Sequence, residues 1–362
     1  MMFTEKAMKA AEEKFSRLLE KAGEKKREEI LSRLAQAEKT ESADVIAAIK
    51  WIYANSPLSD LANYDFEIFQ SCAEHGVFLR ENSPFAKDLP EDIFLNYVLH
   101  VRVNEEELCD CRKFFYGLLA DRVNSLSMHD AIIEANYWNA ENVMYQATDS
   151  RTISALGAYY SAYGRCGEES AFGVNVYRAI GIPARQIYTP RWAHCDDNHA
   201  WVEVWCDGDW HYLGACEPEA VLDKGWFTNA ASRAMMIGSR WYDRAMPDED
   251  VIGKDGMNRI INLLGKYAKT KRITIRVEDL EGTPVGGARV QAEVMNYGEF
   301  SPVAKISADE NGCISFVTGL GSLLICAVYE GTYGERVIDT RDGDEFVCTL
   351  GEEYEDEMWV DF

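Results

Sequence analysis

The sequence predicts an α+β protein with a helical N-terminal region, a core of helices and antiparallel strands, and a C-terminal β-sandwich. Three observations support this fold class. Apolar residues recur at helical spacing through most of the first 142 residues, strand-like alternation begins near residue 184, and short strand-like runs separated by Gly, Pro and Asn follow from residue 272. With 47% apolar residues, the 362-residue chain is long enough to bury more than one core.

The first part, residues 1–89, is predicted to be helical. Phe15, Leu18 and Leu19 recur at helical spacing among Glu, Lys and Ala, and Ser42 precedes the apolar run VIAAIKWIYAN as a candidate N-cap. Nothing in this region indicates chemistry, so we interpret it as a helical packing layer.

The second part, residues 90–268, is predicted to hold the core. Helical patterning continues through the run MHDAIIEANYWNAENV and resumes at Cys166, from which an amphipathic run leads to the helix stop signals Gly181 and Pro183. The runs ARQIYTPRW and HAWVEVWCDGDWHYLGA then alternate as strands, and Asp207-Gly208 is typical of a hairpin turn. A short apolar helix is predicted at IINLLGKYA.

The third part, residues 269–362, contains short strand-like runs such as ITIRVEDLEG, CISFV and LLICAVY, whose spacing suits a β-sandwich. Asp279 and Asp309 fall at its turns. A calcium site is the alternative, but the twelve-residue loop with a closing glutamate is missing, so turn chemistry is favoured. We predict no metal and no cofactor.

Composition excludes several classes of function. The chain has 61 acidic and 37 basic residues, a net charge of −24, and no basic cluster that could track a phosphate backbone, so no nucleic-acid partner is expected. Neither a signal peptide nor an 18-residue apolar run is seen, which predicts a cytoplasmic protein without membrane insertion. The ten cysteines form no CxxC pair, and Cys109 and Cys111 lie two residues apart; most are predicted to be buried small hydrophobes.

Cys166 is different because it lies at or just before the first turn of its predicted helix. Unpaired amides and the positive end of the helix dipole favour a thiolate there, and the thiolate is the reactive form. Gly164 and Gly167 are expected to leave space for a substrate beside the sulfur, while Glu168 and Glu169 complement the dipole.

A reactive thiol needs a base, and His199 is the best candidate among six histidines. It opens the strand HAWVEVW, 33 residues after Cys166, which leaves enough chain to fold the imidazole back against the helix start. His194, in the preceding loop, is a weaker candidate. A Cys/His pair is therefore predicted.

The motifs GRCGEE, RAIGIPAR, NHAWVEVW and WHYLGACEPE, in this order, resemble the transglutaminase-like superfamily of papain-type cysteine enzymes. The resemblance covers about residues 90–265 and extends to peptide N-glycanases. The longer runs TPRWAHCDDNHAWVEVW and WHYLGACEPE resemble a bacterial subgroup that carries a carboxypeptidase-regulatory-like C-terminal domain, which residues 272–350 resemble in turn. The resemblance to the superfamily implies that Cys166 is the nucleophile and that His199 acts as both general base and general acid.

The third catalytic member departs from the family pattern. An aspartate commonly lies four residues after the tryptophan of the second strand, where this chain has Gly214; an acid followed by proline comes three residues later, at Glu217. We predict Glu217 as the orienting acid, with Asp196 and Asp197 in reserve.

Strand pairing shows what this prediction requires. A turn at Asp207-Gly208 places Trp205 opposite Trp210, so that Gly214 shares the face of His199 and a regular strand aims residue 217 away. A bulge at Gly214, or departure from the sheet before Pro218, is therefore needed.

The predicted reaction is acyl transfer. Cys166 attacks an amide carbonyl, His199 protonates the leaving amine, and a thioester remains. The backbone N–H of Cys166 and the run NYWN, Asn136 to Asn139, are the candidate oxyanion donors.

Hydrolysis of peptides, including glycan-linked or cell-wall peptides, is the first interpretation. A transglutaminase is an alternative if tryptophans 192, 201, 205 and 210 wall a tunnel, although sheet packing explains them better. A glycanase-like amidase is weakened by the missing paired-cysteine zinc module. A catalytically silent binding protein, with the sandwich as its interaction arm, is the other class.

Overall fold

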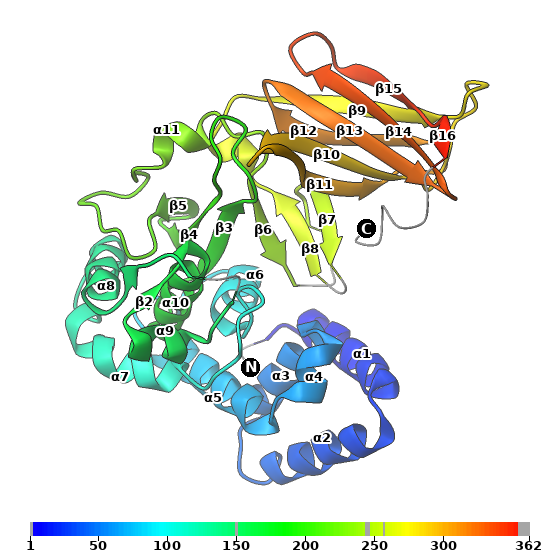
Figure 1. Ribbon diagram of the computed structural model, residues 1–362. Coiled ribbons are helices and arrows are strands. Elements are labelled where there is room, and N and C mark those ends of the chain that lie inside the picture. The colour runs from blue at the N-terminus through cyan, green and yellow to red at the C-terminus, as the bar shows by residue number, and fades with distance from the viewer. Residues whose placement is uncertain (1–2, 149–150, 243–246, 256–257, 354–362) are drawn as a thin grey trace. The chain divides into compact units, whose positions relative to one another are not determined.

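The computed structural model describes residues 3–148, 151–242, 247–255 and 258–353, and the chain forms two compact units (Figure 1). The first comprises Met1–Gln186, Ala200–Gly225 and Tyr242–Ala245; the second comprises Ile187–His199, Trp226–Trp241 and Met246–Phe362. Helices and antiparallel sheets are both present, so the α+β prediction is confirmed. The division at residues 89 and 268 stays a prediction.

The first unit begins with helices, as predicted. They are α1 Glu5–Lys21, α2 Glu24–Ala37, α3 Ala43–Asn55, α4 Leu58–Asn63 and α5 Phe66–Asn82. The predicted N-cap is correct, because the Ser42 hydroxyl accepts the Val45 amide at 3.3 Å. Tyr53 of α3 stacks on Phe69 of α5 with ring centroids 4.5 Å apart, and both side chains are buried, which joins the two helices.

The helical core of the first unit surrounds helix α10. Its elements are α6 Glu91–Phe94, a π-helical turn Leu95–Leu99, α7 Arg112–Val123, α8 Met128–Asn142, β1 Met144–Tyr145, α9 Ala155–Ser161, β2 Tyr163–Gly164 and α10 Cys166–Ala179. Helix α10 packs against α7, α8 and α9 (Figure 1). Phe172 of α10 lies 5.5 Å from Phe115 and 6.1 Å from Trp138, ring centre to ring centre. The helix that carries Cys166 is therefore the most enclosed helix of this core.

The C-terminal end of α10 shows why a glycine follows it. Gly181 has a φ of +88°, and a Cβ there would lie 2.6 Å from the Ser83 hydroxyl oxygen. Both the left-handed backbone and the close approach require glycine. The predicted stop of the helix is thus confirmed.

Across the residues that the structure describes, none of the helices has the length and apolarity needed to span a membrane.

A hairpin in the first unit carries the second predicted motif. Strand β4, His199–Cys206, pairs with β5, Asp209–Leu213, and Trp205 lies opposite Trp210 as predicted. Asp207 and Gly208 have φ values of 53° and 90°, the left-handed conformation of a type I′ turn. The turn sequence therefore sets the register of the ladder.

The second unit contains a set of paired strands followed by two further sheets. The end of β3, Ala184–Thr189, pairs with β6, Gly238–Trp241; β6 pairs with β8, Asn258–Asn262, and β8 with β7, Val251–Asp255. Short helical turns are α11, Thr228–Ala231, and a 3-10 turn, Leu264–Lys266. The helix predicted over IINLLGKYA is wrong in its first half, because Ile260 and Ile261 are β-branched residues that complete a ladder.

The remaining strands form a five-stranded sheet in the order β11-β10-β13-β14-β16 and a three-stranded sheet in the order β12-β9-β15. Their bounds are β9 Thr270–Glu278, β10 Arg289–Asn296, β11 Glu299–Ser307, β12 Cys313–Gly319, β13 Ser322–Tyr329, β14 Thr332–Asp339, β15 Glu345–Thr349 and β16 Glu352–Glu353. Ile275 and Phe316 of the smaller sheet share one hydrophobic cluster with Val294 and Ile325 of the larger.

The acidic residues at the turns of these sheets have local roles. The Asp279 carboxylate accepts the amides of Glu281 and Thr283, and that of Asp309 accepts the amides of Asn311 and Cys313. These are side-chain caps of tight turns, so the turn interpretation is confirmed for both.

Candidate active site

Helix α10 begins at Cys166, as the sequence predicts, and Glu168 holds the residues before it. The Glu168 carboxylate accepts the amide of Arg165 at 3.1 Å, the Arg151 guanidinium at 3.0 Å and the Thr148 hydroxyl at 3.1 Å. These bonds bridge the helix start to the preceding loop. Glu168 is 1% exposed and lies in the first turn of α10, where its carboxylate complements the helix dipole as expected.

The glycines beside Cys166 lie close to other side chains. A Cβ on Gly164 would lie 2.9 Å from the Cβ of Glu168, and one on Gly167 would lie 2.3 Å from the Arg165 guanidinium. Close packing against the Glu168 side chain requires glycine at position 164, whereas the Arg165 guanidinium beside Gly167 is the end of a flexible side chain. The expected space for a substrate beside the sulfur stays a prediction.

The Cys166 sulfur is half-buried and receives a hydrogen bond from the backbone amide of Ala200. Burial raises the pKa of the Cys166 thiol and Glu169 adds to the rise, whereas the Ala200 amide and the Arg165 guanidinium lower it without overcoming the burial. The thiolate expected from the helix start is therefore not the resting form, and the sulfur needs a base when it reacts.

His199 precedes Ala200 in strand β4, so their Cα atoms are about 3.8 Å apart. In the second unit, its ring centre lies 4.7 Å from that of Trp226 and 4.9 Å from that of Phe227. Burial lowers the pKa of His199 to about 4, because the charged imidazolium is disfavoured among these rings. The imidazole is neutral at pH 7 and is in the form that accepts a proton.

The other residues of the predicted loop have structural partners. Asp196 accepts the amide of Tyr297 at 2.7 Å, and Asp197 accepts the amide of Asn198 at 2.8 Å. The ring of His194 lies against Trp192, with centres 5.5 Å apart. These contacts give Asp196, Asp197 and His194 structural roles within the second unit.

The chain leaves the sheet just where the acid prediction requires. Strand β5 ends at Leu213, and a Cβ on Gly214 would lie 2.6 Å from Oε2 of Glu217. The carboxylate of Glu217 thus occupies the space into which a side chain at position 214 would extend. Glycine at 214 and an acid at 217 are two parts of one packing arrangement.

Helix α8 holds this segment in place. The Asn136 side-chain amide donates to the carbonyl of Gly214 at 2.7 Å, and that of Asn139 donates to the carbonyl of Ala215 at 3.3 Å. Their amide hydrogens therefore anchor the loop that leads to Glu217. The predicted oxyanion role of the run NYWN is corrected, because this face of α8 is turned to the end of β5.

Glu169 is a candidate functional residue whose burial the sequence analysis missed. It is 3% exposed, and burial, together with the charges of Glu217 and Glu168, raises its pKa to about 8. It lies three residues after Cys166 on α10, on the neighbouring part of the helix surface. That spacing was the available signal, but two adjacent glutamates at a helix start are also typical of an exposed first turn.

Glu169 makes stability depend on pH. Its folded pKa lies above the ordinary value, so the stability linked to its neutral form is present at low pH and is lost as pH rises toward 8. We expect Glu169→Gln to match the wild type at pH 5 and to exceed its free energy of unfolding at pH 9 by about 5 kcal/mol. Denaturant unfolding at both pH values measures this, with exposed Glu81→Gln as the control. Parallel pH dependence of wild type and Glu169→Gln would contradict the assignment.

Tryptophans contribute mostly to packing. Trp192 and Trp201 are fully buried, and Trp205 lies across the hairpin from Trp210 with ring centres 5.5 Å apart. The sheet-packing interpretation is therefore confirmed for Trp201, Trp205 and Trp210, whereas Trp192 is buried in the loop before β4. Trp226, which the sequence analysis did not single out, is 61% exposed beside His199.

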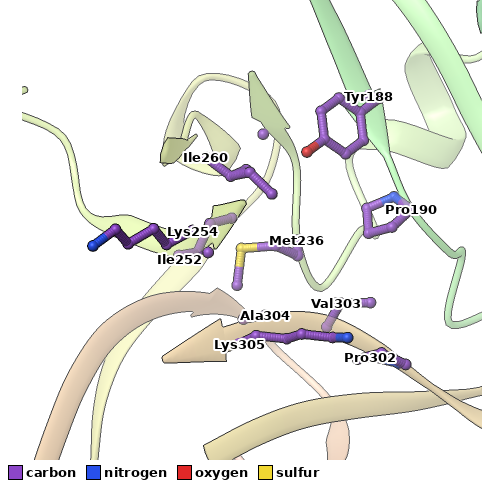
Figure 2. Close-up of a pocket in the computed structure, with 12 residues that line it drawn as sticks. Tyr188, Pro190, Met236, Ile252, Lys254, Ile260, Pro302, Val303, Ala304 and Lys305 are labelled. Atoms are coloured by element: carbon purple, nitrogen blue, oxygen red, sulfur yellow. The ribbon is translucent and has the colours of Figure 1, made fainter. Parts of the chain in front are cut away.

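A cavity of about 440 Å³ lies in the second unit, apart from the predicted catalytic side chains (Figure 2). Met236, Ile252 and Ile260 give it an apolar lining, and Figure 2 shows Tyr188 at its side. Neither Cys166 nor Glu217 lines it. Within the described ranges, no group of three or more His, Cys, Asp or Glu side chains is arranged to hold a metal.

Residues 119–215, about a quarter of the chain, match the model of the transglutaminase-like superfamily. This stretch of the chain is therefore similar to that superfamily. The matched stretch contains Cys166 and His199 and ends two residues before Glu217.

Solved structures give more distant likenesses. A proposed cysteine protease from Cytophaga hutchinsonii shares 18% identity over 51% of this chain and 68% of that protein, with a TM-score of 0.29. Red sea bream transglutaminase shares 10% identity over 77% of this chain and 57% of that protein, with a TM-score of 0.27. No curated protein matches the sequence.

Proposed function

We propose that this protein is a cysteine-dependent acyl-transfer enzyme that hydrolyses peptide or related amide bonds through a thioester on Cys166. One observation carries the proposal: the half-buried Cys166 sulfur, at the first residue of α10, is hydrogen-bonded to the amide that follows His199 in the chain. A nucleophile and a neutral base on adjoining segments are the minimum that acyl transfer needs.

The reaction starts from a thiol and a neutral imidazole. His199 takes the Cys166 proton as the sulfur attacks the carbonyl carbon, and the resulting oxyanion is stabilised by the backbone N–H of Cys166, one of the free amides of the first helical turn. The imidazolium then protonates the leaving amine, and water opens the thioester. Glu217 orients His199 in this scheme.

p-Nitrophenyl acetate tests the proposal, because it acylates a thiol without the protein's own substrate. We expect rapid release of p-nitrophenolate and an acetyl group on the tryptic peptide 166–178, in which Cys166 is the only cysteine. Cys166→Ala is the control. Labelling of Cys166 no faster than that of a free thiol at the same pH would favour the silent binding protein instead.

The fate of the thioester distinguishes the two enzyme classes. Loss of the acetyl group to water at the same rate with and without a primary amine supports hydrolysis. Transfer of the acetyl group to a dansylated primary amine, in preference to water, would replace this proposal with a transglutaminase.

A further inference from the structure

A second pair of thiols lies in the loop before α7. The amide of Cys111 donates to the carbonyl of Cys109 at 3.0 Å, which closes a three-residue turn around Asp110. The Cys111 thiol donates a hydrogen bond to the Asn175 side-chain oxygen at 3.7 Å, and it also interacts with the Cys109 side chain. Cys111 is buried, at 2% exposure, whereas Cys109 is partly exposed.

The two thiols differ in proton affinity. The interaction with the Cys111 side chain, assisted by the backbone amides of Leu156 and Ala155, lowers the pKa of Cys109 to about 7 despite its burial. The pKa of Cys111 is raised by its interaction with Cys109 and by burial. Cys109, which is also the more exposed of the two, therefore has the more acidic thiol.

The turn also meets the Cα-distance requirement of a disulfide. Residues two apart are separated by at most about 7 Å in an extended chain, and the turn at Asp110 shortens this distance. Disulfides form at Cα separations below about 7 Å. Closing the bond removes the Cys111 thiol from the Asn175 side-chain oxygen, 3.7 Å away, but Arg112 still donates to that oxygen at 3.2 Å. The contact of this loop with α10 thus survives.

We propose that Cys109 and Cys111 form a dithiol site, distinct from Cys166, that reacts with low-molecular-weight disulfides and closes to an intramolecular disulfide. The Cys109 thiolate attacks a disulfide RSSR and releases one thiolate RS⁻, which leaves a mixed disulfide on Cys109. Cys111 then loses its proton and attacks the Cys109 sulfur, which releases the second RS⁻. Two protein thiols are oxidised and RSSR is reduced to two RSH.

Tryptic peptides make the test direct. The peptide 103–112 contains Cys109 and Cys111 and no other cysteine, and the peptide 166–178 reports on Cys166. The full chain is incubated with oxidised glutathione, quenched with acid, alkylated with iodoacetamide and analysed by mass spectrometry. We expect peptide 103–112 to be lighter by two hydrogen atoms and without alkyl groups, and dithiothreitol to restore two alkylation sites.

Single variants fix the roles of the two sulfurs. We expect Cys111→Ser to accumulate glutathione on Cys109, and Cys109→Ser to leave Cys111 unmodified because it is buried and protonated. In the unaltered protein, a limiting dose of iodoacetamide at pH 7 should alkylate Cys109 at least about tenfold faster than Cys166. The proposal is overturned if both thiols of peptide 103–112 stay reduced with oxidised glutathione, or if Cys111 carries the mixed disulfide. Neither result depends on whether Cys166 is an enzymatic nucleophile.

Discussion

Replacing His199 with alanine is expected to slow acylation of Cys166 by p-nitrophenyl acetate by about 10²- to 10⁴-fold. Burial raises the pKa of the Cys166 thiol, so a preformed thiolate does not carry the reaction, and the proton must leave as the sulfur attacks. The neutral imidazole of His199 is the proposed acceptor. Stopped-flow release of p-nitrophenolate at pH 7 measures the rate, and His194→Ala, in the loop before β4, serves as the matched control.

The same base predicts the acid limb of the pH profile. Burial lowers the pKa of His199 to about 4, so the imidazole stays neutral and active until pH falls to that value. Acylation by the wild type should therefore decline as pH falls through about 4, with no comparable loss near the ordinary histidine pKa. His199→Ala should lack this limb. Equal rates for wild type and His199→Ala at pH 7 would remove His199 from the mechanism.

Replacing Glu217 with alanine should lower the acylation rate by about 100-fold, because a base that is not oriented loses the aligned geometry of proton transfer. The unusual packing at Gly214 offers a stricter test. A Cβ at position 214 points at the place of the Glu217 carboxylate, with 2.6 Å between them. The Cβ of residue 217 would also lie 2.7 Å from the new Cβ, so residue 217 must lose its whole side chain. We therefore expect the double variant Gly214→Asp/Glu217→Gly to recover part of the lost activity, because it returns a carboxylate to the same space.

Two controls make this exchange interpretable. Gly214→Asp alone should be impaired, since the new side chain collides with Glu217. Gly214→Asn/Glu217→Gly has the same shape as the double variant but no negative charge, and should recover less activity. If Glu217→Ala is as active as the wild type, Glu217 is not the orienting acid, whatever the double variants do.

Local patterns predicted the elements that carry these residues. Asp207-Gly208 fixed the register of the hairpin because only residues that tolerate positive φ form its tight turn. Gly181 marked the end of the helix that begins at Cys166, because its backbone adopts a positive φ that glycine tolerates. Pro183 follows because proline cannot continue a helix. Each signal acts over a few residues, so the sequence alone contains the physical cause.

The same local reasoning failed at IINLLGKYA. Apolar residues in a short run suit a helix or a strand, and Ile260 pairs with Gly253 on one side and with Arg240 on the other. Both partners lie outside the run, so the spacing within it could not distinguish a strand from a helix.

By itself, the sequence determined where α10 begins and how the β4–β5 hairpin pairs, because turns and helix ends depend on adjacent residues. Only the tertiary structure decided the chemistry of the side chains. Burial raised the pKa of the Cys166 thiol, where the helix start had been expected to lower it, and raised the pKa of Glu169 to about 8. A single backbone turn brought Cys109 close to Cys111. Proton affinity depends on the dielectric and on charges supplied by distant segments, and these exist only once the chain has folded.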